Sequence, residues 1–125
     1  MLEISKIILL KLLKASRCAL TTLKGGLVML KPATQKMLIE CARKYGVKAL
    51  WLFGSSLTVD EDDAMDIDLG VEGIDRDMAW EMYSELFDLV YAHCNKIIDF
   101  VAMDEPLSIV HVIRSKGIRI YDAAS

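Results

Sequence analysis

Hydrophobic residues recur at helical spacing in three segments of this chain. Between Pro32 and Gly46 the apolar positions predict a helix with proline in its first turn and glycine as its C-terminal cap. The same spacing predicts helices over residues 75–92 and 106–116, the second of which ends at Gly117. Segments of a different pattern separate these helices.

Short runs of β-forming residues lie between and after the helices. Residues 47–53 are apolar and stop at Gly54, as expected of a buried strand that meets a tight turn. Residues 65–71 alternate acidic and aliphatic side chains over their first half, which predicts a strand with one buried face. Residues 96–102 and 118–121 are predicted as two further strands. The alternation predicts an α/β (α+β) two-layer domain with a mixed sheet of about four strands backed by helices.

The first 28 residues differ from the rest of the chain. Residues 4–13 have aliphatic side chains on one side of a helical wheel and lysines on the other, which predicts an amphipathic helix. Such a helix can pack on the core, on a sister chain or on an anionic membrane surface. We expect residues 1–28 to be an extension and residues 29–125 to be the domain, with Met29 as the true start.

The composition indicates one domain with a substantial core. The chain has 125 residues, of which 54% are apolar and 26% are charged. Met78 and Met82 are expected in this core, and Trp51 and Trp80 are expected to pack rather than to stack on a base. A high apolar fraction in a small chain also favours a homo-oligomer or a complex with a partner.

The cysteines and the longest apolar runs indicate a cytoplasmic protein. Cys18, Cys41 and Cys94 are odd in number and lack a C-x-x-C spacing, so we expect buried thiols in a reducing compartment. No apolar run reaches the roughly 18–20 residues that span a bilayer. A secretory signal is not recognisable, since the first apolar run is short and interrupted by lysines.

Charge is divided unevenly along the chain. The net charge of −3 excludes a uniformly basic protein, so direct binding of nucleic acid is not expected. Residues 1–50 contain ten basic and two acidic side chains, whereas residues 51–125 contain five basic and sixteen acidic ones. Six of these acids lie between Asp60 and Asp68, and the four consecutive acids at 60–63 are predicted to form a solvated loop.

Three aspartates lie on the predicted strands. Side chains at i and i+2 of a strand point to the same face about 6.5–7 Å apart. Asp66 and Asp68 therefore share one face, while Ile67 points to the other. Asp99 lies in the middle of the predicted strand at 96–102, between apolar neighbours, where an acid is costly to bury without a partner or a metal ion.

This arrangement favours metal-assisted phosphate chemistry. Two carboxylates so close repel each other unless a cation lies between them, and Mg²⁺ prefers carboxylate oxygens while keeping positions for water and phosphate. Three carboxylates on neighbouring strands meet the needs of a two-metal site for phosphoryl or nucleotidyl displacement. Gly54 lets the backbone approach a phosphate, and the N–H groups that follow it and the Ser55 hydroxyl can donate to phosphate oxygens.

The order of these motifs resembles the DNA polymerase β-type nucleotidyltransferase superfamily, and within it the minimal nucleotidyltransferases. The matching parts are Leu-Phe-Gly-Ser at 52–55, Asp-Ile-Asp-Leu at 66–69, Asp99 within Ile-Ile-Asp-Phe-Val, and the closing helix and strand over 113–121. The resemblance covers residues 31–121. It implies the two-layer nucleotidyltransferase fold.

The resemblance also implies roles for the matching residues. Asp66 and Asp68 would bind both of two Mg²⁺ ions, and Asp99 would bind the catalytic ion and help to activate the nucleophile. The triphosphate of ATP, the expected donor, would be held by Gly54, Ser55 and Ser56.

One position departs from the pattern of the superfamily. Many members have an arginine about two residues after the Gly-Ser pair, whereas this chain continues with Ser56-Leu57-Thr58. Lys96, Arg114 or a partner chain would then supply the positive charge for the triphosphate.

The function expected from the resemblance is Mg²⁺-dependent transfer of AMP from ATP to a hydroxyl, with release of pyrophosphate. In the minimal family the acceptor is a tyrosine of a small helical HEPN-domain toxin, and the nucleotidyltransferase acts as its antitoxin. Two alternatives stay open at this point. In the first alternative, the chain is a catalytically weak binding module that neutralises its partner by contact. In the second, it is a nucleotidyltransferase that modifies a small molecule.

Overall fold

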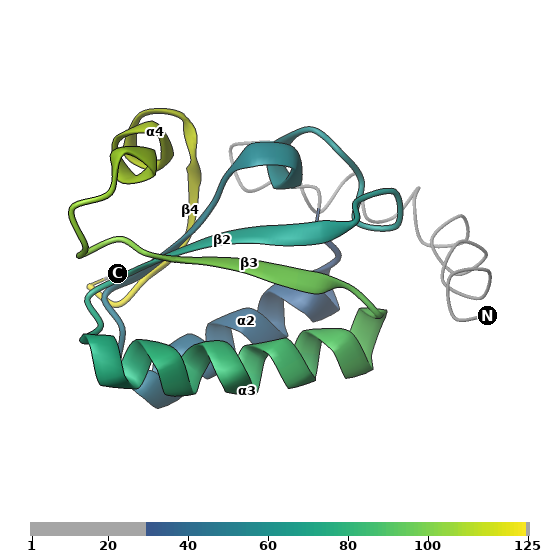
Figure 1. Ribbon diagram of the computed structural model, residues 1–125. Coiled ribbons are helices and arrows are strands. Elements are labelled where there is room, and N and C mark those ends of the chain that lie inside the picture. Colours follow the sequence, from purple (N-terminus) through teal and green to yellow (C-terminus); the bar gives the residue numbers. More distant parts are fainter. Residues whose placement is uncertain (1–29, 125) are drawn as a thin grey trace.

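The computed structural model describes residues 30–124, which form a two-layer domain, a four-stranded sheet with helices packed against it (Figure 1). The strands are β1 (Ala49–Leu52), β2 (Asp66–Glu72), β3 (Ile97–Ala102) and β4 (Ile118–Asp122). The helices are α2 (Pro32–Tyr45), the single 3₁₀ turn η1 (Gly54–Leu57), α3 (Arg76–Cys94) and α4 (Ser108–Lys116). The extension predicted over residues 1–28, with its amphipathic helix and Cys18, lies outside the described residues.

The sheet is mixed, as predicted. Its strand order is β3-β2-β1-β4. β1 pairs antiparallel with both β2 and β4, whereas β2 pairs parallel with β3. The parallel pair requires a crossover, and α3 is that connection.

Helices α2 and α3 cover one face of the sheet (Figure 1). The aliphatic positions of β2 alternate with its acids, so Ile67, Leu69 and Val71 all point into this layer and are at most 1% exposed. Leu38 of α2 and Leu86 of α3 meet them and are fully buried. The main core therefore lies between the sheet and these two helices.

The helix ends follow from local sequence. Pro32 begins α2, and Gly46 ends it in the left-handed conformation (φ 67°), with its N–H donating to the carbonyl oxygens of Ala42 and Arg43. Asp75 caps α3, because its carboxylate accepts a hydrogen bond from the Met78 N–H at 2.9 Å.

The opposite face of the sheet is covered only in part. Helix α4 lies on it, across the sheet from α2 and α3 (Figure 1). Gly70 permits this packing, because a Cβ there would come within 2.7 Å of the Met103 sulfur and 3.3 Å of Ile113. This smaller cluster also contains Ala49, Trp51 and Phe53 of the β1 segment. The part of the face that contains the N-terminal half of β2 is therefore left for polar side chains.

The core predictions hold for some residues and fail for others. Met82 is fully buried and Trp51 is 9% exposed, but Met78 is 36% exposed and Trp80 is 70% exposed. Met78 was expected in the core, and this was wrong, whereas Trp80 packs on the Tyr83 ring at the surface. Cys41 is buried, and this burial raises the pKa of its thiol to about 11. Between residues 30 and 124, no helix is long and apolar enough to cross a membrane.

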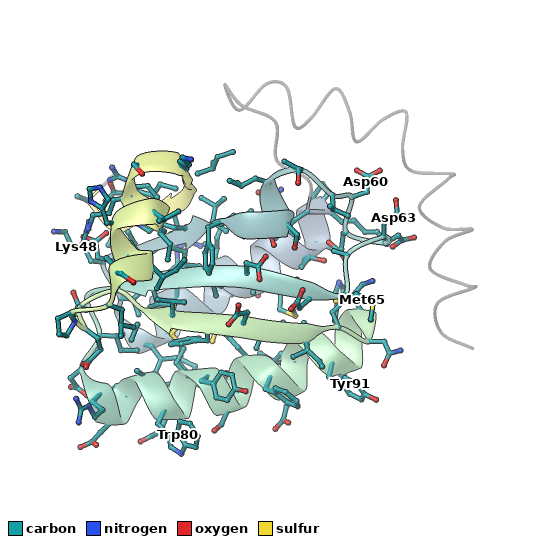
Figure 2. The ribbon with its side chains drawn as sticks, turned by 45° about the horizontal axis from the view of Figure 1, so that its top comes forward. Lys48, Asp60, Asp63, Met65, Trp80 and Tyr91 are labelled. Atoms are coloured by element: carbon teal, nitrogen blue, oxygen red, sulfur yellow. The ribbon has the colours of Figure 1, made fainter. Side chains whose placement is uncertain are left out.

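The acidic run at 60–63 is not a solvated loop throughout. Glu61 is 1% exposed and accepts hydrogen bonds from the Lys31 backbone N–H and the Thr34 hydroxyl, each at 2.9 Å. The Asp62 carboxylate, 1% exposed, lies 3.1 Å from the Lys31 ammonium. Asp60 and Asp63 lie on the outer side of the loop (Figure 2), and of the four acids only Asp63 is fully exposed. Two of the four acids thus attach this loop to the start of α2.

Candidate active site

Three carboxylates share the open part of the sheet face. Asp66 and Asp68 project from β2 on the side opposite Ile67, as the alternation predicted. Asp99 of β3 is the direct register partner of Asp68. Neighbouring strands lie about 4.8 Å apart, so the three side chains arise from one small area of the face. Sequence alone could not have established this register.

The burial of the three acids differs strongly. Asp68 is 7% exposed, Asp66 is half-buried and Asp99 is exposed. Asp99 does not carry the cost of burial that its apolar neighbours suggested. Ile98 and Phe100 point to the other face of the sheet, whereas the Asp99 side chain is exposed to solvent. Asp99 is therefore accessible to a substrate.

Ser55 holds the most buried carboxylate in place. The Ser55 backbone N–H and hydroxyl both donate to Oδ2 of Asp68, at 3.0 and 2.9 Å. Hydrogen bonds to an ionised acceptor are the stronger ones in proteins. The turn that follows β1 is thus attached directly to the neighbouring strand at Asp68.

Gly54 makes this attachment possible. Its φ of +60° lies in the left-handed region, and a Cβ at this position would lie 2.7 Å from Oδ2 of Asp68. Both facts require glycine. The Gly-Ser motif predicted from sequence therefore has a geometric reason in the described structure, namely the close approach of the η1 backbone to the Asp68 carboxylate.

Ser56 has a different surrounding from Ser55. It is 2% exposed, and its hydroxyl accepts a hydrogen bond from the Asp68 backbone N–H at 2.9 Å. This buried hydrogen bond thus links η1 to β2. Of the two serines predicted to contact a triphosphate, only Ser55 is partly open to solvent.

The carboxylates share a face without converging on one point. Within residues 30–124, no group of three or more His, Cys, Asp or Glu side chains is close enough to hold a metal ion. The chemistry of the set still fits a hard divalent cation, since all the donors are carboxylate oxygens on adjacent strand positions. Ligation requires the side chains to turn toward each other, and the hydrogen bonds to Ser55 restrain Asp68.

The basic side chains suggested as replacements for the missing arginine are engaged elsewhere. Lys96 is 6% exposed and donates from its ammonium to the carbonyl oxygens of Asp62 and Ala64, at 3.2 and 2.5 Å. Arg114 pairs with Glu72 at 3.1 Å. Neither cation is therefore directed at the Gly54–Ser55 turn. Of the three suggested sources of positive charge, the partner chain is the one left.

Sequence reasoning missed the support beneath the site. Lys96 and Glu61 hold the loop that leads from η1 into β2, and hence the strand position of Asp66. Their partners lie 27–34 residues away along the chain. A local pattern gives no signal for contacts of this separation.

The chain belongs to a known family of transferases. Residues 36–125 match the family described as Polymerase beta, Nucleotidyltransferase. The match spans most of the chain and includes the Gly-Ser turn and all three aspartates. The protein is therefore a member of the polymerase β-type nucleotidyltransferases, as the order of its motifs indicated. Its sheet and helices confirm the two-layer nucleotidyltransferase fold.

Solved structures of similar fold come from toxin–antitoxin complexes. A chain of the MntA–HepT toxin–antitoxin is 16% identical with a TM-score of 0.54, over 75% of this chain and 74% of that one. A chain of a toxin–antitoxin with AMP-PNP is 19% identical with a TM-score of 0.55, over 71% and 73%. A chain from the complex of a tri-AMPylated Shewanella oneidensis HEPN toxin with MNT antitoxin is 16% identical with a TM-score of 0.53, over 74% and 72%. At this identity the likeness concerns the fold. Among curated protein sequences, none matches this chain.

Proposed function

We propose that this protein is a Mg²⁺-dependent nucleotidyltransferase that transfers AMP from ATP to a hydroxyl of a HEPN-type partner protein and thereby acts as its antitoxin. The observation that supports this proposal is the register of Asp68 with Asp99 on the open sheet face, beside the Gly54–Ser55 turn. The family supports nucleotidyl transfer in general. The donor, the metal ions and the acceptor are the finer parts of the proposal.

The three aspartates divide the work by position. Asp66 and Asp68 would hold both metal ions, and the exposed Asp99 would bind the catalytic ion and help to activate the acceptor hydroxyl. Bound Mg²⁺ lowers the pKa of an attacking hydroxyl and stabilises the pyrophosphate that leaves. Two such ions would also reverse the charge of this acidic face, which would then attract a triphosphate rather than repel it.

Ser55 would exchange partners when the nucleotide binds. Its N–H and hydroxyl donate to Asp68 in the described structure, and both are the donors expected to hold a phosphate oxygen. A triphosphate can accept them only if the Asp68 carboxylate gives them up. A divalent cation offers Asp68 that alternative, so metal and triphosphate are expected to bind together rather than independently.

The acceptor is proposed from the comparisons and from the size of the domain. Structures of similar fold occur in complexes with HEPN toxins, one of which carries AMP groups. Residues 30–124 form one sheet and the helices packed against it, so we expect the acceptor hydroxyl to come from another chain. A partner would also provide the positive charge that Lys96 and Arg114 do not direct to the turn.

The proposal is tested by label transfer. The full chain is incubated with ATP labelled on the α-phosphate, Mg²⁺ and the product of the neighbouring gene, which we expect to be a HEPN-domain protein. We expect the label on the partner, and a fall of roughly 10²–10³-fold in Asp66→Asn or Asp68→Asn, the usual effect of removing one group that stabilises transition-state charge. Asp63→Asn, an exposed carboxylate in the same part of the chain, is the control and should transfer at the normal rate.

Two outcomes would contradict the proposal. If the wild-type protein transfers no label, and the double variant Asp66→Asn/Asp68→Asn still inhibits the partner, the protein acts by contact alone. If label moves to a small molecule and never to the partner, the acceptor assignment is wrong while nucleotidyl transfer stands.

A further inference from the structure

An exposed row of aromatic side chains runs along α3. Trp80 is 70% exposed, Tyr91 is 55% exposed and Phe87 is 36% exposed. Neighbouring rings in this row contact each other, with centroids 5.7 Å apart for Trp80 and Tyr83, 6.0 Å for Tyr83 and Phe87, and 6.5 Å for Phe87 and Tyr91. Figure 2 shows Trp80 and Tyr91 projecting outward from α3. Exposed aromatic clusters of this kind mark binding surfaces.

An acidic row borders the aromatic one. At 100° per residue, the four aromatic positions lie within about 80° of the helix circumference. The exposed acids Asp77, Glu81 and Asp88 fall immediately beside them, on the side away from the sheet. The aromatic row therefore lies between the sheet edge and a line of negative charge.

The N-terminal part of this row lines a groove that extends to the candidate active site. The groove has a volume of about 740 Å³ and lies between α3 and β3. Trp80 and Tyr83 form its helix side, while Phe100 and Asp99 form its strand side. Tyr83 contacts Phe100 with ring centroids 5.8 Å apart, which joins the two sides. The groove thus reaches Asp99 at the sheet edge, while the Asp99 carboxylate projects from the other face of the same strand.

We propose that this groove and the aromatic row are the docking surface for the acceptor protein. The occupant is a helix of the partner with apolar side chains three and four residues apart, flanked by lysine or arginine. This inference rests on the proposed function, which requires a surface that binds the acceptor protein. The aromatic rings pack against the apolar side chains of the partner helix, and its cations form ion pairs with Asp77, Glu81 and Asp88.

Charge and continuity favour this occupant. The bordering acids repel a second copy of the same surface, so an isologous dimer through α3 is disfavoured. A basic partner is attracted, and it would bring positive charge to the edge of a site that needs it. The groove reaches Asp99 at the edge of the sheet, so a helix seated in it lies beside the strand whose other face bears the carboxylate. β3 is also an edge strand of the described sheet, so no neighbouring strand separates the groove from solvent.

The surface is tested first by affinity. Trp80→Glu removes the most exposed ring of the row and places a charge, costly to desolvate, where an apolar side chain of the partner should pack. We expect the Kd for the HEPN-domain partner, measured by calorimetry, to rise at least tenfold. Glu81→Lys should also raise the Kd, and its effect should shrink as salt is added. The matched control is Val112→Glu on α4, which places the same charge on a 44% exposed apolar position of another helix and should bind as the wild type does. Equal affinities for all four proteins would overturn the proposal.

The occupant is identified by cross-linking. A photo-reactive phenylalanine derivative is placed at position 91 in the full chain, and the product is mapped by mass spectrometry in the presence of the partner. A cross-link to an apolar position of a partner helix supports the proposal. A cross-link to a second copy, a cross-link to residues 1–29 of the same chain, or no cross-link would overturn it.

These tests separate the docking surface from the proposed activity. If the wild-type protein transfers no label but Trp80→Glu weakens partner binding, the docking surface stands and the proposed function fails. If Asp68→Asn abolishes transfer while Trp80→Glu binds and transfers normally, the proposed function stands and the docking surface fails.

Discussion

Asp68 accepts two hydrogen bonds from a single residue, Ser55, and donates its own backbone N–H to Ser56. At the scale of the residue, this junction connects the two motifs that the sequence presents separately, Gly-Ser and Asp-x-Asp. Gly54 sets the spacing, because only a residue without Cβ fits 2.7 Å from the Asp68 carboxylate. The consequence is that the position of the turn and the position of the carboxylate depend on each other.

Replacement of Gly54 tests this dependence. Gly54→Ala is expected to destabilise the protein by about 1–2 kcal/mol through its left-handed backbone, and additionally to displace Asp68 and abolish label transfer. Gly46→Ala is a matched control, since Gly46 has a similar φ of 67° but nothing within 4 Å of the added Cβ. It should lose stability in urea unfolding by a similar amount and retain transfer. Equal activity in both variants would show that contact with Asp68 is unimportant.

At the scale of the element, helix α2 depends on a loop far away in sequence. Lys31 is its N-cap and offers no side-chain cap. Glu61 supplies the missing acceptor from the acidic run, through the Lys31 N–H and the Thr34 hydroxyl. Lys96 holds the same loop through its carbonyl groups. The acidic run therefore stabilises the packing of α2 against the sheet, in addition to any effect of its charge.

Removing the Glu61 carboxylate is expected to reveal this role. Glu61→Ala leaves the Lys31 N–H and the Thr34 hydroxyl without their buried acceptor, which costs about 1–3 kcal/mol in the free energy of unfolding. Asp63→Ala changes an exposed acid two residues away and should stay within about 0.5 kcal/mol. Chemical denaturation of both variants measures the difference. A Glu61→Ala protein as stable as Asp63→Ala would contradict the role assigned to this carboxylate.

At the scale of the whole molecule, Glu85 joins the two helices that cover the sheet. Its carboxylate accepts hydrogen bonds from the Lys44 ammonium and the Tyr45 hydroxyl, each at 2.8 Å. The hydrogen bond from Lys44, and then that from Tyr45, lower the pKa of Glu85 below its usual value of 4.5. The same contact raises the pKa of Tyr45 to about 12. The lowered pKa of Glu85 favours its ionised carboxylate in the folded state, and the raised pKa of Tyr45 keeps its hydroxyl protonated as the donor.

The stability of the protein should therefore depend on pH through Glu85. A carboxylate with a lowered folded pKa stabilises the fold above its unfolded pKa, and that contribution is lost as the pH falls through the folded value. We expect Glu85→Gln to be slightly less stable than wild type at pH 7 and equally stable at pH 3. Glu81→Gln, an exposed change on the same helix, is the control. A difference that is independent of pH would mean that Glu85 acts through packing.

Much of the fold and part of the site could be predicted because they depend on local pattern. Local sequence sets the ends of α2 at Pro32 and Gly46. The alternation around Ile67 sets which side chains of β2 point to each face of the sheet. The prediction that Met78 lies in the core failed because an apolar residue on a helix has the same local signal whether it lies beside the core or at the edge of the buried face. The partners of Glu61 lie 27 and 30 residues away, and their hydrogen bonds exist only after the chain has folded.

The sequence by itself determined the elements, the family and the three aspartates, since periodicity and motif spacing are properties of neighbouring residues. Only the tertiary structure decided that Asp68 pairs in register with Asp99, that Ser55 holds Asp68, and that the acidic run is partly buried. The physical reason is that register and burial depend on which strands pair and which surfaces pack. The aromatic groove beside Asp99 belongs to the same class, because it forms where α3 and β3 meet.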